Sequence, residues 1–234
     1  MKITENEKML LRVVKKIPAE FQNQIVFLGG AIIGCLITDS GIGDIRNTQD
    51  VDLIVGIKSR VEFQKFEEKL RRAGFSPSTE EDAPICRWRV DNVSVDIMPC
   101  NADILGFSNK WYKSAVEDVK TIILEDVVIR IVSAPYFLAT KVEAFLGRGK
   151  NDFLGSSDME DIVTLIDGRK ELVDEIRNSE SELQEYLRDI FLKWLKNRDF
   201  LGCLAGHSTA GPANKVRTEG VKRRICEIAG TDFC

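Results

Sequence analysis

Short apolar runs and alternating hydrophobic and polar positions dominate the first half of the chain, and these patterns predict β-strands. The strands are expected at residues 25–28, 51–55, 85–90, 93–98 and 127–132. Elsewhere apolar residues recur every three to four positions, which is typical of amphipathic helices. The helices are expected at residues 5–16, 31–38, 61–73, 134–146, 158–166, 171–177 and 182–196.

The order of these elements predicts the fold class. Strands alternate with helices up to about residue 133, and mostly helices follow. We therefore predict an α+β fold with a mixed β-sheet and flanking helices in residues 1–133, followed by a smaller helical subdomain in residues 134–234.

A β-hairpin is predicted around Asp91-Asn92, because both side chains tolerate left-handed backbone in a two-residue loop. Such a loop pairs Val90 with Val93 and Arg87 with Asp96. The apolar pairs should face the core. Arg87 and Asp96 are therefore expected on the opposite, polar face of the hairpin.

Composition favours a soluble protein. Of the 234 residues, 44% are hydrophobic, which suffices for one core or for a core plus a small subdomain. No apolar run approaches the length of a membrane span, and the N-terminus lacks the layout of a signal peptide. We expect a cytoplasmic protein that has no membrane partner.

The six cysteines are scattered without a Cys-x-x-Cys pair, and His207 is the single histidine. This spacing argues against a structural zinc site and predicts thiols rather than a disulfide framework.

Although the net charge of the chain is −4, a segment near the C-terminus is locally basic. It is either a solvated helical surface or a patch that binds a polyanion. Its basic residues are Lys193, Lys196, Arg198, Lys215, Arg217, Lys222, Arg223 and Arg224.

Two aspartates mark a candidate cation site. Asp50 and Asp52 stand at positions i and i+2 of a predicted strand, so their carboxylates project from one face. Carboxylate oxygens suit Mg²⁺, which completes its coordination with water and phosphate oxygens. Taken alone, such a pair is more often a solvated strand end or turn.

Two further features support that interpretation. Gly29-Gly30 follows a strand and opens a helix, where missing side chains let backbone N–H groups approach a phosphate, although a packing turn is the simpler alternative. Asp96 is a carboxylate within an apolar strand, which is explained by a metal or a bound nucleotide, or by the wet face of an edge strand.

These segments together resemble the nucleotidyltransferase superfamily. The resemblance rests on Phe27-Leu28-Gly29-Gly30-Ala31, on residues 48–55 with Asp50-Val51-Asp52, and on Val95-Asp96-Ile97. Residues 139–162, which include Lys141, resemble the lysine motif and the following acidic helix of bacterial AbiEii-type toxin nucleotidyltransferases.

The resemblance implies roles for individual residues. Gly29 and Gly30 would hold the triphosphate, and Asp50 and Asp52 would bind metal, with two Mg²⁺ ions expected and Mn²⁺ as a possible substitute. Asp96 would complete the metal site or activate the acceptor. We also place three residues among those that bind the nucleotide: Thr48, Arg87 and Lys141. Without the resemblance, Lys141 would be interpreted as a solvated charge on a helix.

Two departures from the family pattern stand out. The first family motif often reads Gly-Ser, and Gly30 removes that hydroxyl. The glycines are also farther from Asp50 than in minimal members, so the loop around residues 41–47 must absorb the extra length. Poly(A)- and CCA-adding polymerases also carry Gly-Gly, but an Arg-Asp pair usually follows it, and this pair is absent here. Resemblance to these polymerases is therefore the second interpretation.

The implied function is transfer of a nucleoside monophosphate from an NTP such as ATP or GTP to an acceptor hydroxyl, with release of pyrophosphate. The acceptor could be RNA, tRNA included, for a toxin that has a cognate antitoxin protein as its partner. The alternatives are a small-molecule or protein nucleotidyltransferase, and a non-catalytic nucleotide-binding module of the same fold.

Overall fold

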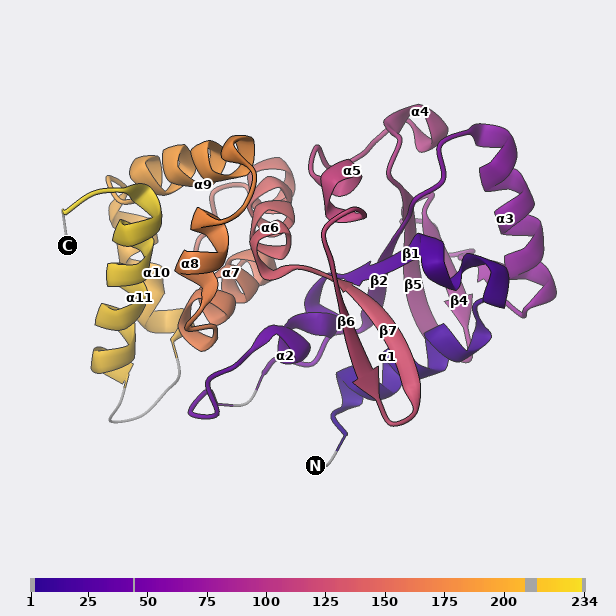
Figure 1. Ribbon diagram of the computed structural model, residues 1–234, viewed down its shortest axis with the longest axis horizontal. Coiled ribbons are helices and arrows are strands. Elements are labelled where there is room, and N and C mark those ends of the chain that lie inside the picture. Colours follow the sequence, from indigo (N-terminus) through magenta and orange to yellow (C-terminus); the bar gives the residue numbers. More distant parts are fainter. Residues whose placement is uncertain (1–2, 44, 209–213, 233–234) are drawn as a thin grey trace. The chain divides into compact units, whose positions relative to one another are not determined.

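The computed structural model describes residues 3–43, 45–208 and 214–232, and these form two compact units (Figure 1). We call them the sheet unit, Met1–Cys35 with Arg46–Ser133, and the helical unit, Leu36–Ile45 with Ala134–Cys234. The sequence placed residues 36–45 in the first domain. In the structure this segment groups with the helical unit instead.

The sheet unit is built on a mixed sheet, which over the described residues has seven strands in the order β3-β4-β5-β2-β1-β7-β6. β2 runs parallel to β5, and β1 runs parallel to β7, while the other neighbours are antiparallel. The predicted α+β class is therefore confirmed. The strands are β1 Ile25–Leu28, β2 Asp50–Val55, β3 Ser76–Pro77, β4 Arg87–Val90, β5 Val93–Pro99, β6 Val119–Leu124 and β7 Val127–Val132.

Helix α1, Glu5–Lys16, packs against β2, β5 and β7 of the sheet. Its N-terminus is fixed by a capping box, in which the Thr4 hydroxyl accepts from the Glu7 N–H and the Glu7 carboxylate accepts from the Thr4 N–H. The other helices of this unit are η1 Ala19–Gln24, η2 Gly30–Ile32, α3 Arg60–Arg72, α4 Ala102–Leu105 and α5 Tyr112–Ala115.

The helix expected at residues 31–38 is shorter in the structure. A 3₁₀ turn, η2, leads into α2, Ile33–Leu36, and the chain then leaves helical geometry. The backbone N–H groups of Thr38 and Asp39 donate to the Gly168 carbonyl oxygen at 3.0 and 2.9 Å. These bonds to a distant residue replace the helical ones and tie residues 36–45 into the helical unit.

The helical unit continues with six further helices among the described residues. Their core contains an aromatic cluster of Phe145, Phe153 and Trp194 with ring centroids 4.9–5.8 Å apart, in which Trp194 makes edge contacts with both phenylalanines. No helix in the described part of the chain combines the length and apolar character needed to cross a membrane. The helices are α6 Ala134–Arg148, α7 Ser157–Gly168, α8 Leu172–Arg177, α9 Ser181–Trp194, α10 Arg198–His207 and α11 Asn214–Ala229.

The cysteines agree only in part with the expectation of thiols. Cys35, Cys86, Cys100 and Cys203 are free, whereas Cys226 is disulfide-bonded, contrary to that expectation.

Candidate active site

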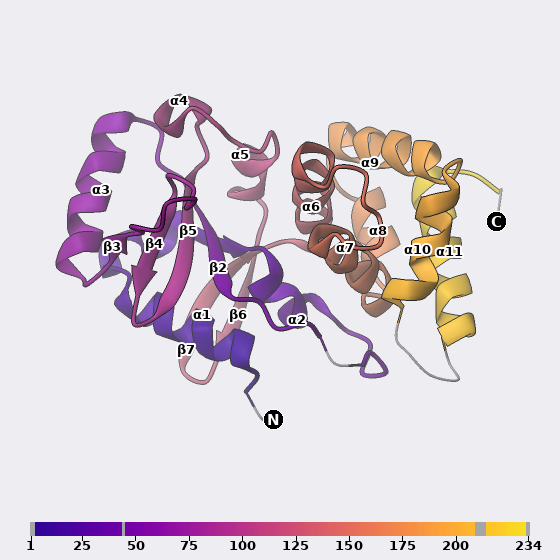
Figure 2. The ribbon, with the colours of Figure 1, turned by 180° about the vertical axis from the view of Figure 1, so that it is seen from behind.

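Asp50 and Asp52 lie on β2, a central strand of the sheet, beside the parallel strand β5 (Figure 2). The register places Asp52 opposite Asp96 and Asp50 opposite Ser94. Because paired positions of neighbouring strands share a face, the structure brings all three predicted aspartates to one face of the sheet.

The β4–β5 hairpin has the predicted register, with Arg87 opposite Asp96 and Val90 opposite Val93. Asp91 and Asn92 have φ angles of 46° and 63°, so both loop residues adopt the left-handed conformation of a type I′ turn. The apolar members of the hairpin are buried, and Arg87 therefore lies with Asp96 on the polar face.

Arg87 makes the principal ion pairs of this site. Its Nε and Nη2 donate to Oδ1 and Oδ2 of Asp96, each at 2.7 Å, in a bidentate pair. The same Nη2 donates to Oδ2 of Asp50 at 3.0 Å. The hydrogen bond to Asp96 and the charges of Asp96, Asp50 and Asp52 raise the pKa of Arg87, so the guanidinium stays charged.

The neighbouring thiol is not a candidate nucleophile. Burial, together with the negative charge of Asp96, raises the pKa of Cys86 to about 12. A thiol with so high a pKa carries almost no thiolate near neutral pH.

Gly29 is required by both backbone conformation and space. Its φ of 72° and ψ of −172° form a combination that is essentially restricted to glycine. A Cβ atom at this position would lie 1.8 Å from Oδ2 of Asp52. The glycine turn that ends β1 therefore holds its backbone directly against one of the candidate metal ligands, and Gly30 follows it as the first residue of η2.

The side chain of Asp50 is held in place by Thr48 and, through Thr48, by Asn6, which was not among the predicted site residues. The Thr48 hydroxyl donates to Oδ1 of Asp50 at 2.9 Å. The Thr48 backbone N–H in turn donates to Oδ1 of Asn6 at 3.1 Å, and Asn6 Nδ2 donates to the Arg46 carbonyl oxygen at 3.2 Å. Asn6 is buried on α1, so a polar residue on the buried face of that helix was the available signal.

Lys141 lies in the helical unit and is buried, not a solvated charge on a helix surface. Its Nζ lies 2.6 Å from Oδ2 of Asp161 and 3.1 Å from Oδ1 of Asp158. Asp158 also accepts two hydrogen bonds from Arg148, at 2.8 and 2.9 Å. The ammonium is therefore engaged in a charge cluster between α6 and α7, and its expected contact with phosphate stays a prediction.

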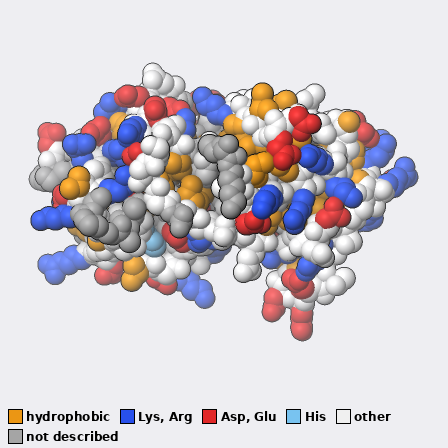
Figure 3. Space-filling view, turned by 90° about the horizontal axis from the view of Figure 1, so that it is seen from below, with side chains coloured by type: hydrophobic (Ala, Val, Ile, Leu, Met, Phe, Trp, Pro, Cys, Tyr) orange, Lys and Arg blue, Asp and Glu red, His pale blue; other side chains and the backbone are white. Residues whose placement is uncertain are grey.

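The basic segment near the C-terminus is partly structural. Arg224 donates to the carbonyl oxygens of Ile166 and Asp167 at the end of α7, at 2.6 and 2.8 Å. Arg217 donates to the Asp167 carboxylate at 2.8 Å. On the face shown in Figure 3, basic side chains lie among acidic ones. Five basic residues of the segment remain exposed: Lys193, Lys196, Arg198, Lys215 and Arg223.

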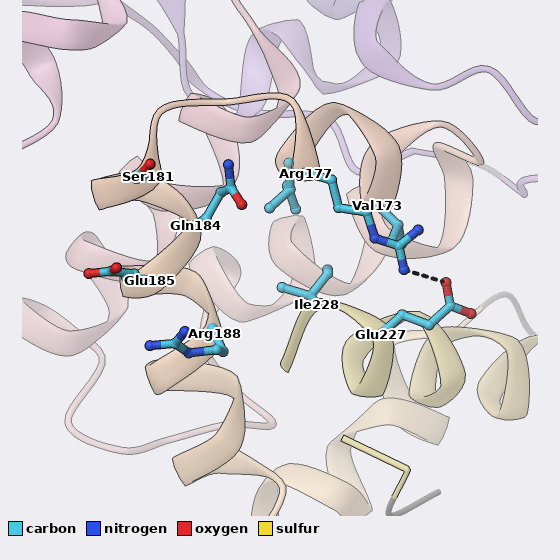
Figure 4. A pocket seen from close by; sticks show the side chains of 9 residues that line it. Val173, Arg177, Ser181, Gln184, Glu185, Arg188, Glu227 and Ile228 are labelled. Atoms are coloured by element: carbon cyan, nitrogen blue, oxygen red, sulfur yellow. Dashed lines mark ion pairs between the residues drawn. The ribbon is translucent and has the colours of Figure 1, made fainter. Parts of the chain in front are cut away.

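A hollow of about 240 Å³ lies between α8, α9 and α11 of the helical unit (Figure 4). Val173, Ile176 and Ile228 contribute apolar side chains to its lining, and Arg177, which also lines it, lies 3.8 Å from Glu227. The three aspartates of the sheet unit do not line it.

The donor set of the aspartates fits a hard divalent cation. Among the described residues no group of three or more acidic, histidine or cysteine side chains is already gathered around one metal position. Asp50 and Asp96 nevertheless converge on one cationic atom, Nη2 of Arg87. Carboxylates that converge on a cation are the ligands that Mg²⁺ prefers.

Comparison with known proteins supports the fold. No protein-family model matches the sequence, and no curated protein does. An antigenic nucleotidyltransferase-like protein from Paracoccidioides brasiliensis is similar in structure, with a TM-score of 0.51 and 18% identity over 89% of this chain and 96% of that chain. The JHP933 protein of Helicobacter pylori has a TM-score of 0.48 and 13% identity over 98% of this chain and 94% of that chain. The first similarity shows a nucleotidyltransferase-like fold.

Proposed function

We propose that this protein is a metal-dependent nucleotidyltransferase, which transfers a nucleoside monophosphate from an NTP to an acceptor hydroxyl and releases pyrophosphate. The observation that carries the proposal is the meeting of Asp50, Asp52 and Asp96 with the Gly29 turn on one face of a nucleotidyltransferase-like sheet.

Each residue has a task in this reaction. Asp50, Asp52 and Asp96 would hold Mg²⁺ or Mn²⁺, which when bound stabilises negative charge on the phosphates and aligns the reacting oxygens. Gly29 leaves room for the Asp52 carboxylate beside the turn, and Gly29 and Gly30 would hold the triphosphate, as the sequence resemblance implies. Asp96 has the lower side-chain exposure of the two Arg87 partners, 12% against 32% for Asp50, and would also accept the proton of the acceptor hydroxyl.

The proposed acceptor is RNA, tRNA included, in an AbiEii-like toxin that is neutralised by an antitoxin protein. Support comes from the sequence resemblance and from exposed basic side chains of the helical unit, including Lys193, Lys196 and Arg223. Arg217 and Arg224 are not assigned to RNA binding, because their guanidinium groups are engaged by Asp167 and Ile166 within the helical unit.

The test is incubation of the purified protein with each α-³²P-labelled NTP, Mg²⁺ and either total RNA or total protein. We expect label in the RNA fraction. Asp52→Asn should reduce transfer at least about a hundredfold, in line with the loss of a charge stabiliser in the reaction, while the circular dichroism spectrum stays unchanged.

Asp82→Asn is the matched control, because Asp82 is an exposed aspartate of the same unit. It should transfer label at the parent rate. Undiminished transfer in excess EDTA, or by Asp52→Asn, would refute the proposed function. Label in the protein fraction would replace only the proposed acceptor.

A further inference from the structure

The guanidinium of Arg87 occupies the position at which a divalent cation would have to bind Asp50 and Asp96. Both carboxylate oxygens of Asp96 accept from it, and Oδ2 of Asp50 lies 3.0 Å from its Nη2. The other oxygen of Asp50, Oδ1, accepts from Thr48. All four oxygens of these two carboxylates are therefore engaged by the chain itself.

Arg87 and a metal ion therefore compete for these oxygens. Mg²⁺ binds carboxylate oxygens at about 2.0–2.1 Å, and a guanidinium within hydrogen-bond distance of the same lone pairs would meet the ion at close range as a like charge. The guanidinium cannot relieve the repulsion by losing a proton. A metal ion that binds the lone pairs of Asp50 and Asp96 held by Arg87 therefore has to displace the guanidinium.

We propose that Arg87 is an internal counter-cation, which competes with the divalent metal for Asp50 and Asp96 and is drawn away by the triphosphate of the incoming nucleotide. The inference rests on the proposed function. Metal alone would bind weakly because it must displace Arg87, whereas metal and NTP together would give the guanidinium a phosphate partner. Binding of metal and binding of nucleotide would thereby be coupled, each strengthening the other.

The chain offers a matched control on the same strand and the same face. Arg89 is two residues from Arg87 on β4; it lies opposite Ser94 rather than Asp96, and it pairs with Glu80 at 2.6 Å. Replacing Arg89 removes one positive charge from the strand without freeing the carboxylates of Asp50 and Asp96.

The experiment is a titration of Mn²⁺ without nucleotide, with free Mn²⁺ measured by electron paramagnetic resonance. Arg87→Gln should bind Mn²⁺ at least about tenfold more tightly than the parent, a difference that corresponds to about 1.4 kcal/mol. Arg89→Gln should bind it as the parent does. A non-hydrolysable NTP analogue should tighten Mn²⁺ binding in the parent and much less in Arg87→Gln.

A second measurement covers the case in which Arg87→Gln folds poorly. Arg87→Lys keeps the charge but cannot form the bidentate pair, so its Mn²⁺ affinity should fall between those of the parent and Arg87→Gln. In EDTA, the melting temperature of both variants should be below that of the parent, and Mn²⁺ should restore it.

Equal or weaker Mn²⁺ binding by folded Arg87→Gln and Arg87→Lys would overturn the inference. These titrations need neither acceptor nor turnover. Tighter binding without any NMP transfer would therefore refute the proposed function alone, and transfer with unchanged Mn²⁺ affinity would refute the role of Arg87 alone.

Discussion

Replacing Lys141 by methionine tests whether the charge cluster between α6 and α7 holds the helical unit together. Lys141 is 8% exposed, and its two partners Asp158 and Asp161 are each 2% exposed. Methionine keeps most of the length and apolar volume of the side chain while removing the ammonium. The change therefore isolates the charge from the packing.

The expected cost follows from the contacts. Removing one member of a buried ion pair typically costs about 3–5 kcal/mol, because a buried charge loses its compensation. Asp158 keeps its two hydrogen bonds from Arg148, so the loss falls mainly on Asp161, whose oxygen lies 2.6 Å from Nζ. We therefore expect a loss of unfolding free energy at the lower end of this range, about 3 kcal/mol. For a chain of this size, such a loss lowers the melting temperature by roughly 6–12 °C.

The assay is urea unfolding at pH 7, followed by circular dichroism at 222 nm. Lys193→Met, at an exposed lysine of α9, should change the free energy of unfolding by less than about 0.5 kcal/mol. Adding Asp161→Asn to Lys141→Met should recover part of the loss, because the carboxylate that lost its Lys141 ion pair is then neutral.

A loss below about 1 kcal/mol in Lys141→Met would refute this assignment. If the same variant, still folded, bound NTP more weakly, the phosphate contact implied by the family resemblance would gain support. The unfolding and nucleotide-binding measurements together therefore separate the two roles.

Two further predictions concern the glycine turn and acid stability. Gly29→Ala should abolish NMP transfer and lower the melting temperature, because its Cβ would collide with Asp52; Gly74→Ala, which also has positive φ but open space around it, should keep full transfer in the same assay. Burial alone would raise the pKa of Asp158, but the hydrogen bonds and charges of Arg148 and Lys141 outweigh it and lower the pKa below the usual 3.8. Because the folded pKa of Asp158 lies below its unfolded value, the ionised carboxylate stabilises the protein above about pH 4, and this stabilisation is lost as pH falls through the folded pKa. Urea unfolding between about pH 5 and 3 should therefore show a steeper loss of stability in the parent than in Asp158→Asn. An equal dependence of stability on pH in the two proteins would refute this.

The sheet face with the three aspartates could be predicted because strand periodicity is local. A two-residue loop at Asp91-Asn92 fixes every pair of the β4–β5 hairpin, including Arg87 with Asp96, without knowledge of the remaining chain. The alternation of two positions also places Asp50 and Asp52 on one face.

The contacts that were not predicted all depend on distant partners. The burial of Lys141 is decided by Asp158 and Asp161, which lie on the following helix, and helical periodicity alone does not identify them. Asn6 is buried because it binds the segment before β2, about 40 residues away along the chain. Helix α11 was not predicted from the sequence either. It carries many charged residues, so its apolar stripe was too weak to indicate an amphipathic helix.

The segment Leu36–Ile45 affects how this protein can fold during its synthesis. The segment emerges from the ribosome well before its partners, Gly168 and Glu171; the Glu171 carboxylate accepts from the Thr38 hydroxyl across 133 positions of sequence. Until those residues are translated, Leu36–Ile45 lacks the contacts that tie it into the helical unit, and the helical unit in turn is not complete without this early segment. A protein cut after Ser133 would retain the early segment and lose its partners Gly168 and Glu171, and a fragment beginning at Ala134 would lack a piece of its own unit. A single cut in the gene therefore does not separate the two units.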